Sequence, residues 1–457
     1  MQSMTLQEIA QAVDGTLTFG GEIRVDEIST DTRKIRGGSL YLALKGERFD
    51  GHDFISKAIE AGARAVVSDR PVECSCPVIQ VPDTRLALGT LAAYYRQKFS
   101  LLTVGVTGSV GKTSTKEMIA AVLAQGFCVH KTQGNFNNDI GLPMTLFGLE
   151  PQHTAAVIEM GMSALGEISY LSQLAKPDLA VITNVGVSHL ENLGSRENIL
   201  KAKLEILDGM SPNSKIVLNA DNDMLQSVRD SLGERAVWFG IEQKDGFVFA
   251  EHIEEDGDKT RFDFVCGGER YPAMVPAVGI HNVYNALAGF TVGMFSGIAP
   301  EKIVAAIGEY QNSGLRQSVR EYDGIKVIAD CYNASPDSMQ SALSVIRTIS
   351  CSGKRYAVLG DMLELGECSG EMHYKVGKLA AKAGLSGLLC YGEEAKQIAR
   401  GALEAGFDLT ESCTSLQEAV NWLHRVLRPG DAVILKASRG MHLESVIESA
   451  FEKAGGQ

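Results

Sequence analysis

Short β-branched runs alternate with longer amphipathic stretches from Leu101 onward, and this alternation limits the possible folds of the 457-residue chain more than any other feature. Strands and helices in regular succession build a parallel sheet that helices cover on both faces. Buried strands are predicted at 101–106, 155–161, 179–185 and 215–221. Helices are predicted between them at 113–125, 166–175 and 196–207. The sequence therefore predicts an α/β fold around a central parallel sheet.

The pattern changes twice further along the chain. Between Gly246 and Val275, polar and apolar residues alternate around glycine turns, which predicts antiparallel strands at the edge of that sheet. A helix that begins near His281 closes this region. A second series of strands follows in segments 324–333, 355–362, 387–394 and 431–438. Helices are expected near 336–347, 371–383, 393–405 and 440–454, and together these elements predict a separate Rossmann-like domain.

The N-terminal residues form a third region. Segments 64–70 and 77–83 predict short strands, and a helix near 84–98 leads into the middle of the chain. The length is about three times that of a typical domain. We therefore expect three domains, at 1–98, 99–313 and 314–457.

Composition excludes several classes of protein. The 56 acidic and 43 basic side chains give a net charge of −13, which disfavours general binding to nucleic acid. The N-terminus lacks a basic head followed by an apolar run, and no stretch approaches 18 uninterrupted apolar residues, so neither secretion nor membrane insertion is expected. The nine cysteines are scattered, and Cys74 and Cys76 fit no structural zinc spacing. Reduced thiols in a cytoplasmic protein are expected.

A glycine-rich loop lies between the strand that ends at Val106 and the next helix. It reads Thr107, Gly108, Ser109, Val110, Gly111, Lys112 and Thr113. Such a loop turns its amides towards a phosphate, while the lysine reaches the β and γ oxygens and the threonine hydroxyl binds Mg²⁺. The strict pattern requires glycine where Val106 stands, and the alternative is a strand-to-helix turn without a ligand. The strand before and the helix after favour a phosphate site.

This loop resembles that of the Mur ligases and of their folylpolyglutamate synthetase relatives. Two longer segments, 132–143 (TQGNFNNDIGLP) and 330–339 (DCYNASPDSM), resemble the branch that adds D-alanyl-D-alanine to a UDP-N-acetylmuramoyl tripeptide. Ser335 stands where this branch commonly has asparagine. Segments at 29–33, 43–46 and 49–52 resemble the UDP-binding domain of the same branch.

The resemblance covers all three predicted domains and implies a role for each. It implies an N-terminal α/β domain that binds UDP, a central P-loop ATPase domain and a C-terminal Rossmann-like domain that binds the incoming dipeptide. The implied enzyme is a monomeric ligase in peptidoglycan precursor synthesis, with ATP and two Mg²⁺ ions. Its reaction would move the γ-phosphoryl group onto a carboxylate, and an amine would then attack the acyl phosphate.

Four residues are candidates for holding Mg²⁺: Thr113, Glu159, His189 and Lys203. Glu159 follows a predicted strand, where open parallel sheets bind ligands, although a turn carboxylate is the alternative. His189 matches a family histidine, but a lone histidine is more often a packed residue. In related ligases the lysine of this segment is carbamylated; Lys201 competes for that role, and Lys203 is otherwise an exposed helix residue.

The resemblance assigns further residues to ligands. Beside the loop, the ATP contacts are Asn282, Asn285, Arg316 and Asp330, although Asn282 could cap a helix and Arg316 could form an interdomain salt bridge. The catalytic residues are Lys112, Glu159, His189, Lys203 and Arg316. The substrate residues are Ser29, Thr30, Asp31, Arg33, Asp50, His52, Asn135, Asn137, Asn138, Tyr332, Asn333, Ser438 and Arg439.

Two other functions share the phosphate loop. A sister ligase that adds a single amino acid, or one that adds glutamate to folate, should lack the 132–143 and 330–339 segments. A nucleotide switch would bind nucleotide, but its hydrolysis would not depend on a carboxylate and an amine together.

Overall fold

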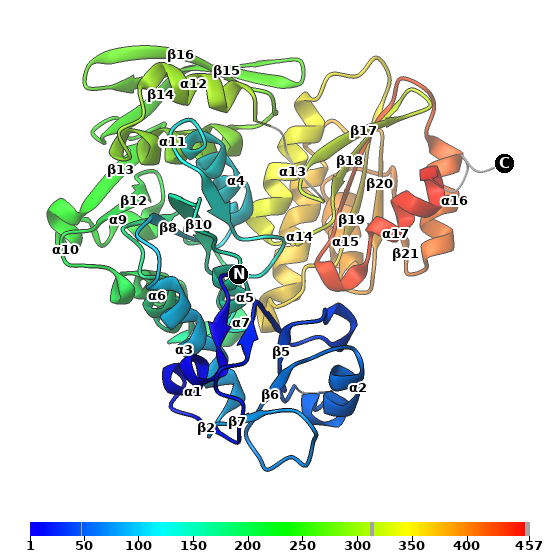
Figure 1. Ribbon diagram of the computed structural model, residues 1–457. Helices are drawn as coiled ribbons and strands as arrows, with labels where there is room; N and C mark the ends of the chain where they lie inside the picture. Colours follow the sequence, from blue (N-terminus) through cyan, green and yellow to red (C-terminus); the bar gives the residue numbers. More distant parts are fainter. Residues whose placement is uncertain (47, 311–314, 453–457) are drawn as a thin grey trace. The chain divides into compact units, whose positions relative to one another are not determined.

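The computed structural model describes residues 1–46, 48–310 and 315–452, and Figure 1 shows the course of the chain. The chain forms two compact units. The first contains Met1–Thr107, Gly126–Val181 and Ala202–Ile216, and the second contains Gly108–Gln125, Ile182–Lys201 and Val217–Gln457. The predicted domain boundary near 313 lies outside the described residues.

The N-terminal part of the first unit is a small α/β layer. Its five-stranded sheet has the order β2-β7-β6-β5-β4, in which only β2 runs antiparallel to its neighbour. The strands are β2 (Thr16–Leu17), β4 (Glu27–Ser29), β5 (Ser39–Leu42), β6 (Ala65–Ser68) and β7 (Val78–Gln80), and β1 (Met4–Thr5) pairs separately with β3 (Arg24–Val25). The helices are α1 (Leu6–Ala12), α2 (Ile55–Glu60) and α3 (Thr84–Arg96).

The helix predicted at 84–98 is confirmed as α3, and its first residue has a local cause. The Asp83 side chain accepts hydrogen bonds from the Arg85 and Leu86 backbone N–H groups, which otherwise have no partner in the first turn. The strands predicted at 64–70 and 77–83 are confirmed as β6 and β7.

The first unit also holds a series of neighbouring strands in the order β11-β8-β10-β9. These strands are β8 (Leu102–Thr107), β9 (Val129–Lys131), β10 (Ala155–Glu159) and β11 (Leu179–Ile182). β8 and β10 are parallel and pair Val106 with Glu159, so their carboxyl ends reach the same edge. Helices α5 (Gly141–Phe147) and α6 (Glu167–Ala175) belong to this part. The predicted strands at 101–106, 155–161 and 179–185 are confirmed.

The second unit holds a series of neighbouring strands in the order β16-β15-β14-β13-β12. Their bounds are β12 (Lys215–Asn219), β13 (Ala236–Gly240), β14 (Val248–Asp256), β15 (Lys259–Cys266) and β16 (Glu269–Val275). The predicted antiparallel strands are confirmed as β14, β15 and β16, although β14 itself runs parallel to β13. The helices are α4 (Lys112–Leu123), α7 (Leu190–Leu193), α9 (Asp223–Gln226), α10 (Arg229–Leu232), α11 (Ile280–Phe295) and α12 (Pro300–Gly308), while α8 (Arg196–Leu204) crosses from one unit to the other.

A six-stranded sheet forms the C-terminal part of the second unit, with the order β17-β18-β22-β19-β20-β21. β17 runs antiparallel to β18, and all the other neighbouring pairs in this sheet are parallel. The strands are β17 (Ser318–Tyr322), β18 (Ile325–Asp330), β19 (Arg355–Gly360), β20 (Gly387–Tyr391), β21 (Thr410–Cys413) and β22 (Ala432–Lys436). This confirms a Rossmann-like arrangement with a parallel sheet.

Helices cover both faces of this sheet. Residues of α13 (Pro336–Thr348), α14 (Ser369–Ala380) and α15 (Ala395–Glu404) build one buried apolar cluster, and residues of α16 (Leu416–Val426) and α17 (Glu444–Ile447) build the other. Figure 1 shows α13 in yellow and α16 and α17 in orange and red on opposite sides of the strands. The apolar residues of β18, β19 and β22 are therefore buried on both faces, as their continuous apolar runs predict.

Two predictions for this region were wrong or incomplete. The single helix predicted at 440–454 is instead a 3₁₀ turn (Arg439–Met441), the short helix α17 and a π-helical turn (Glu448–Glu452). His442 ends the 3₁₀ turn with a left-handed backbone (φ 49°), which a continuous helix cannot contain. The predicted elements did not include β17, β21 or α16.

No helix in the described parts of the chain is long and apolar enough to cross a membrane.

Candidate active site

The glycine-rich loop requires glycine at two positions. Gly108 and Gly111 have φ angles of 152° and 83°, and a Cβ atom on Gly108 would lie 1.9 Å from Thr183 Oγ1. Helix α4 begins directly after the loop, at Lys112. The loop amides and the first turn of α4 thus form the kind of helix N-terminus that attracts phosphate groups.

The segment that follows β11 holds this loop in place. The Ser109 and Val110 N–H groups donate to the Asn184 backbone oxygen (3.0 Å) and to Asn184 Oδ1 (2.9 Å). Thr183 Oγ1 donates to the Val110 carbonyl (2.6 Å), and the Gly186 N–H donates to Ser109 Oγ (2.9 Å). These neutral hydrogen bonds hold the loop and do not involve the side chains of Lys112 or Thr113.

Lys112 bends back over its own loop. Its Nζ atom donates to the Gly108 carbonyl oxygen at 2.9 Å, which keeps the positive charge beside the loop amides. Thr113, the next residue of α4, is buried. The structure therefore places a cation and a hydroxyl at the same helix N-terminus, as the motif predicts.

Asn282 and Asn285 connect α11 to α4 beneath the loop. Thr115 Oγ1 donates to Asn285 Oδ1 (2.9 Å), and Asn282 Nδ2 donates to the Val278 carbonyl (2.9 Å). Gly279 is the N-cap residue of α11, so the alternative that Asn282 caps this helix is wrong. Their predicted contact with ATP stays a prediction.

Glu159 is buried at the carboxyl end of β10 and is held by the 132–143 segment. Asn137 Nδ2 donates to Glu159 Oε1 at 2.8 Å, and the Glu159 N–H donates to Thr132 Oγ1 at 3.0 Å. Asn138 has a different task, because its Oδ1 accepts from the Gly141 N–H (2.8 Å) at the start of α5. Within the predicted substrate segment, Asn137 therefore orients a predicted metal ligand and Asn138 shapes the loop; Asn135 is exposed.

The two competing lysines of α8 differ in exposure. Lys203 is buried, with 1% of its surface exposed, whereas Lys201 is exposed. The alternative that Lys203 is an exposed helix lysine is therefore wrong. Carbamylation of Lys203 stays a prediction.

His189 pairs with a carboxylate that the sequence analysis did not select. Its Nδ1 lies 2.8 Å from Glu364 Oε2, in the segment after β19. The hydrogen bond from His189 lowers the pKa of Glu364 against the opposing effect of burial, and the nearby Lys112 acts in the same direction as His189. The described parts of the chain contain no group of three or more His, Cys, Asp and Glu side chains that could hold a metal ion.

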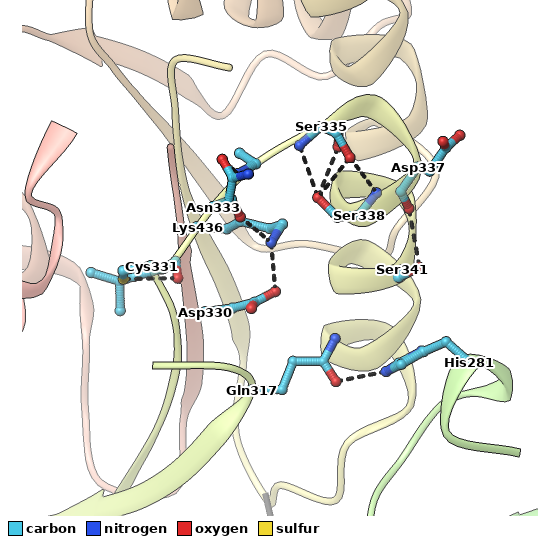
Figure 2. A network of polar contacts seen from close by, with 12 residues as sticks. His281, Gln317, Asp330, Cys331, Asn333, Ser335, Asp337, Ser338, Ser341 and Lys436 are labelled. Atoms are coloured by element: carbon cyan, nitrogen blue, oxygen red, sulfur yellow. Dashed lines mark hydrogen bonds and ion pairs between the residues drawn. The ribbon is translucent and has the colours of Figure 1, made fainter. Parts of the chain in front are cut away.

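Asp330 and Lys436 form a buried ion pair at the ends of β18 and β22 (Figure 2). Lys436 Nζ donates to Asp330 Oδ2 at 2.8 Å and to the Asn333 carbonyl at 2.9 Å. Nearby, the Arg316 guanidinium lies over the Tyr332 ring, 3.9 Å from its centroid. The structure thus brings together four residues predicted for nucleotide or dipeptide, together with Lys436, which was not among them.

Hydrogen bonds and an ion pair also hold the neighbouring turn after β22. Ser438 Oγ accepts a hydrogen bond from the Leu363 N–H (2.9 Å), and Arg439 pairs with Glu444 (2.9 Å). Asp361 Oδ1 accepts from the Ala395 N–H (2.7 Å) at the start of α15. Asp361 therefore contributes to the structure of the turn before α15.

The predicted substrate residues of the N-terminal layer form two clusters. In the first cluster, Ser29 Oγ donates to the Asp31 backbone oxygen, and the Arg33 guanidinium pairs with the Asp31 carboxylate. Thr30 lies between Ser29 and Asp31 in the sequence. In the second cluster, His52 lies between two carboxylates, with Nδ1 2.6 Å from Asp50 and Nε2 3.1 Å from Asp69.

Hydrogen bonds from His52 and then from Arg70 hold the pKa of Asp50 well below its usual range. Asp69 and Arg70 were missed in the sequence. They are the last two residues of the strand predicted at 64–70, and this place at a strand end is a signal that could have selected them.

Three family models match this chain. They are described as Mur ligase family, catalytic domain (residues 24–96), Mur ligase middle domain (106–293) and Mur ligase, glutamate ligase domain (316–439). Among curated proteins, the chain is similar to the UDP-N-acetylmuramoyl-tripeptide–D-alanyl-D-alanine ligases of Bacillus subtilis and Escherichia coli. The identities are 39% and 36%, and each comparison covers 99% of both chains.

Solved structures give the same picture. A crystal structure of MurF from Acinetobacter baumannii matches with a TM-score of 0.91 at 31% identity, over 99% of both chains. The MurF ligase of Thermotoga maritima in complex with ADP matches with a TM-score of 0.83 at 30% identity, over 94% of this chain and 98% of that one.

Proposed function

The chain belongs to the Mur ligase family, and on this premise we propose that it uses ATP to join D-alanyl-D-alanine to UDP-N-acetylmuramoyl-tripeptide. The observation that carries the proposal is the similarity of the whole chain, at 39% identity, to a relative named for that reaction. The bonded geometry of the 107–113 loop supports the use of ATP, as does the ADP-bound relative.

The chemistry needs an activated carboxylate, because a carboxylate is a poor electrophile for an amine. Transfer of the γ-phosphoryl group of ATP onto the carboxylate of the tripeptide gives an acyl phosphate and ADP. The amine of D-alanyl-D-alanine then attacks the carbonyl carbon, and phosphate leaves. Lys112 offsets the charge of the transferring group, the loop amides hold the phosphates, and Arg316 is a second cation for the same charge.

Some of the residues predicted to bind Mg²⁺ carry the ligand atoms that this ion prefers. The Thr113 hydroxyl and the Glu159 carboxylate are oxygen donors, which Mg²⁺ prefers, and the Asn137 amide holds one oxygen of Glu159 in a fixed position. His189 pairs with Glu364 through Nδ1, so Nε2 is the nitrogen through which it would bind a metal. Bound Mg²⁺ would neutralise phosphate charge; Thr113 and Glu159 are its proposed ligands, and His189 and Lys203 are proposed around a second ion.

The substrates are proposed to lie on different domains. Residues 1–98 would bind the UDP end through the Asp31 and Asp50 clusters, residues 99–313 would bind ATP, and residues 314–457 would bind the dipeptide near Tyr332, Asn333, Ser438 and Arg439. Because ATP and UDP-linked precursors are cytoplasmic compounds, we propose that the reaction takes place in the cytoplasm. We also propose that the enzyme is a monomer.

Phosphate release with each substrate supplied alone and with both together tests the proposal. We expect phosphate release when UDP-N-acetylmuramoyl-tripeptide, ATP and D-alanyl-D-alanine are supplied together. Little phosphate should be released when either the UDP-N-acetylmuramoyl-tripeptide or the dipeptide is omitted. A matched reaction with D-alanine or D-glutamate in place of the dipeptide separates this ligase from its sisters. Equal phosphate release without either substrate would indicate a nucleotide switch, and preference for the single amino acid would indicate a sister ligase.

A further inference from the structure

Lys436 and Asp330 face each other because of the sheet register. They are directly paired residues at the last positions of the adjacent parallel strands β22 and β18, although 106 residues separate them in sequence. Directly paired residues of a sheet point to the same face. The ion pair therefore lies at the carboxyl edge of the sheet, where open α/β sheets bind their ligands.

The pair is shielded from water. The side chains of Lys436 and Asp330 are 3% and 10% exposed. An ammonium group has three donors, and Lys436 uses one on Asp330 Oδ2 and another on the Asn333 carbonyl. A carboxylate accepts about four hydrogen bonds, so Asp330 with Lys436 on one oxygen keeps the capacity to accept a hydroxyl of a nucleotide.

The same ammonium fixes the loop that follows β18. This loop, residues 331–335, contains Tyr332 and Asn333, and Figure 2 shows Lys436 between Asp330 and Asn333. The loop has two further attachments. Cys331 Sγ donates to the Leu435 carbonyl (3.2 Å), and Ser335 forms a capping box with Ser338 at the start of α13. Lys436 thus holds the middle of a loop whose two ends are fixed separately.

We infer that Lys436 is a positioning residue that couples the nucleotide and dipeptide sites by holding Asp330 and the 331–335 loop with one ammonium group. The inference rests on the proposed function, with Asp330 as the nucleotide contact that the sequence resemblance implies and with the dipeptide at Tyr332 and Asn333. It predicts that loss of the ammonium weakens both ligands together and leaves the UDP substrate unaffected.

Lys436→Met removes the charge and both hydrogen bonds while keeping the length of the side chain. We expect the KM values for ATP and for D-alanyl-D-alanine each to rise about tenfold, since charge-assisted hydrogen bonds orient both partners. The KM for UDP-N-acetylmuramoyl-tripeptide should change less than about twofold, and Lys436→Arg, which keeps the charge, should recover part of both losses. Lys326→Met is the matched control. Lys326 lies near the opposite end of β18 from Asp330 and pairs with Asp258, so its substitution should change no KM value.

Binding of a fluorescent ADP analogue, measured without turnover, separates this inference from the proposed function. A weaker affinity in Lys436→Met supports the inference even if the wild-type protein fails to ligate D-alanyl-D-alanine. Unchanged nucleotide affinity in folded Lys436→Met overturns it, and so does an equal rise of all three KM values. If Lys436→Met does not fold, Lys436→Arg is the deciding variant. A role that depends on the geometry of the ammonium group is contradicted if this variant has wild-type thermal stability and wild-type KM values for ATP and the dipeptide.

Discussion

Lys112 carries a full positive charge in a loop that other residues hold in shape. Because Asn184, Thr183 and Ser109 provide the loop hydrogen bonds, Lys112→Ala should leave the fold intact. Loss of the cation at the transferring phosphoryl group should lower turnover by about 10³ or more. Phosphate release and a thermal melt of the same sample measure the two effects. Activity near that of the wild type would contradict the ATP site.

Asn137 and Asn138 are neighbours in sequence but differ in their contacts. Asn137→Ala removes the donor to Glu159 Oε1, so we expect it to raise the Mg²⁺ concentration needed for half-maximal activity. Asn138→Ala removes the acceptor for the Gly141 N–H and should cost about 1 kcal/mol of stability without changing the Mg²⁺ requirement. A Mg²⁺ titration of both variants checks this. Equal Mg²⁺ curves would assign both residues to loop structure.

Lys203 is a buried lysine on a helix, which makes its charge state decisive. If it is carbamylated, Lys203→Ala removes an anion beside the proposed metal, and turnover should fall strongly. Acetate or formate added to the variant should then restore part of the activity, with no effect on the wild type. Lys201→Ala, in the exposed neighbour, is the control and should be active. Absence of rescue together with normal turnover would end the carbamate hypothesis.

Sequence reasoning identified residues whose role depends on local pattern and missed those whose role depends on pairing. The 107–113 loop was predictable because the glycines, Lys112 and the flanking strand and helix are contiguous. Lys436 and Glu364 act through partners 106 and 175 residues away, Asp330 and His189, and no local pattern encodes that proximity. Asn137 could be assigned to a site, but its contact with Glu159 required the structure.

At the scale of elements, α14 contacts α15 so closely at one of its glycines that no side chain fits, whereas another glycine of α14 has open space around it. A Cβ atom on Gly377 would lie 2.0 Å from the Ile398 carbonyl oxygen in α15, whereas a Cβ on Gly370 in α14 meets nothing within 4 Å. Gly377→Ala should therefore lose about 1–3 kcal/mol of stability through overpacking. Gly370→Ala should gain about 0.5 kcal/mol from helix propensity.

Urea unfolding of the two variants measures this contrast within one helix. The same substitution, with opposite signs, separates close helix packing from a general effect of alanine. If both variants were equally stabilised, the close approach of α14 to α15 would be contradicted.

Predicted and observed elements agree where the pattern is strong. The buried strands β8, β10, β18 and β22 are continuous apolar runs, and their positions were predicted within a few residues. The edge strand β21 (TESC) has mostly exposed or half-buried polar residues, so periodicity did not reveal it. The sheet order, with β22 between β18 and β19, depends on pairing that sequence periodicity does not contain.

At the scale of the whole molecule, the C-terminal sheet carries its own hydrophobic core. The two buried clusters on its faces consist of residues from Val327 to Ala450, so they need no residue from before the 313 boundary. A fragment of residues 315–457 should therefore fold alone and unfold cooperatively in urea. Circular dichroism during the titration measures this. A fragment without a cooperative transition would contradict the proposed boundary.

The position of β22 in that sheet also affects the chain while it is being synthesised. β22 is the last strand to leave the ribosome, yet it lies between β18 and β19, which emerge about 80 to 110 residues earlier at a rate of about 5–20 residues per second. For several seconds, β18 and β19 therefore lack the strand that pairs with both, and Asp330 lacks Lys436. A chain that stops between Asp330 and Lys436 keeps this carboxylate without its cation, and its strands β18 and β19 lack the strand that pairs with both.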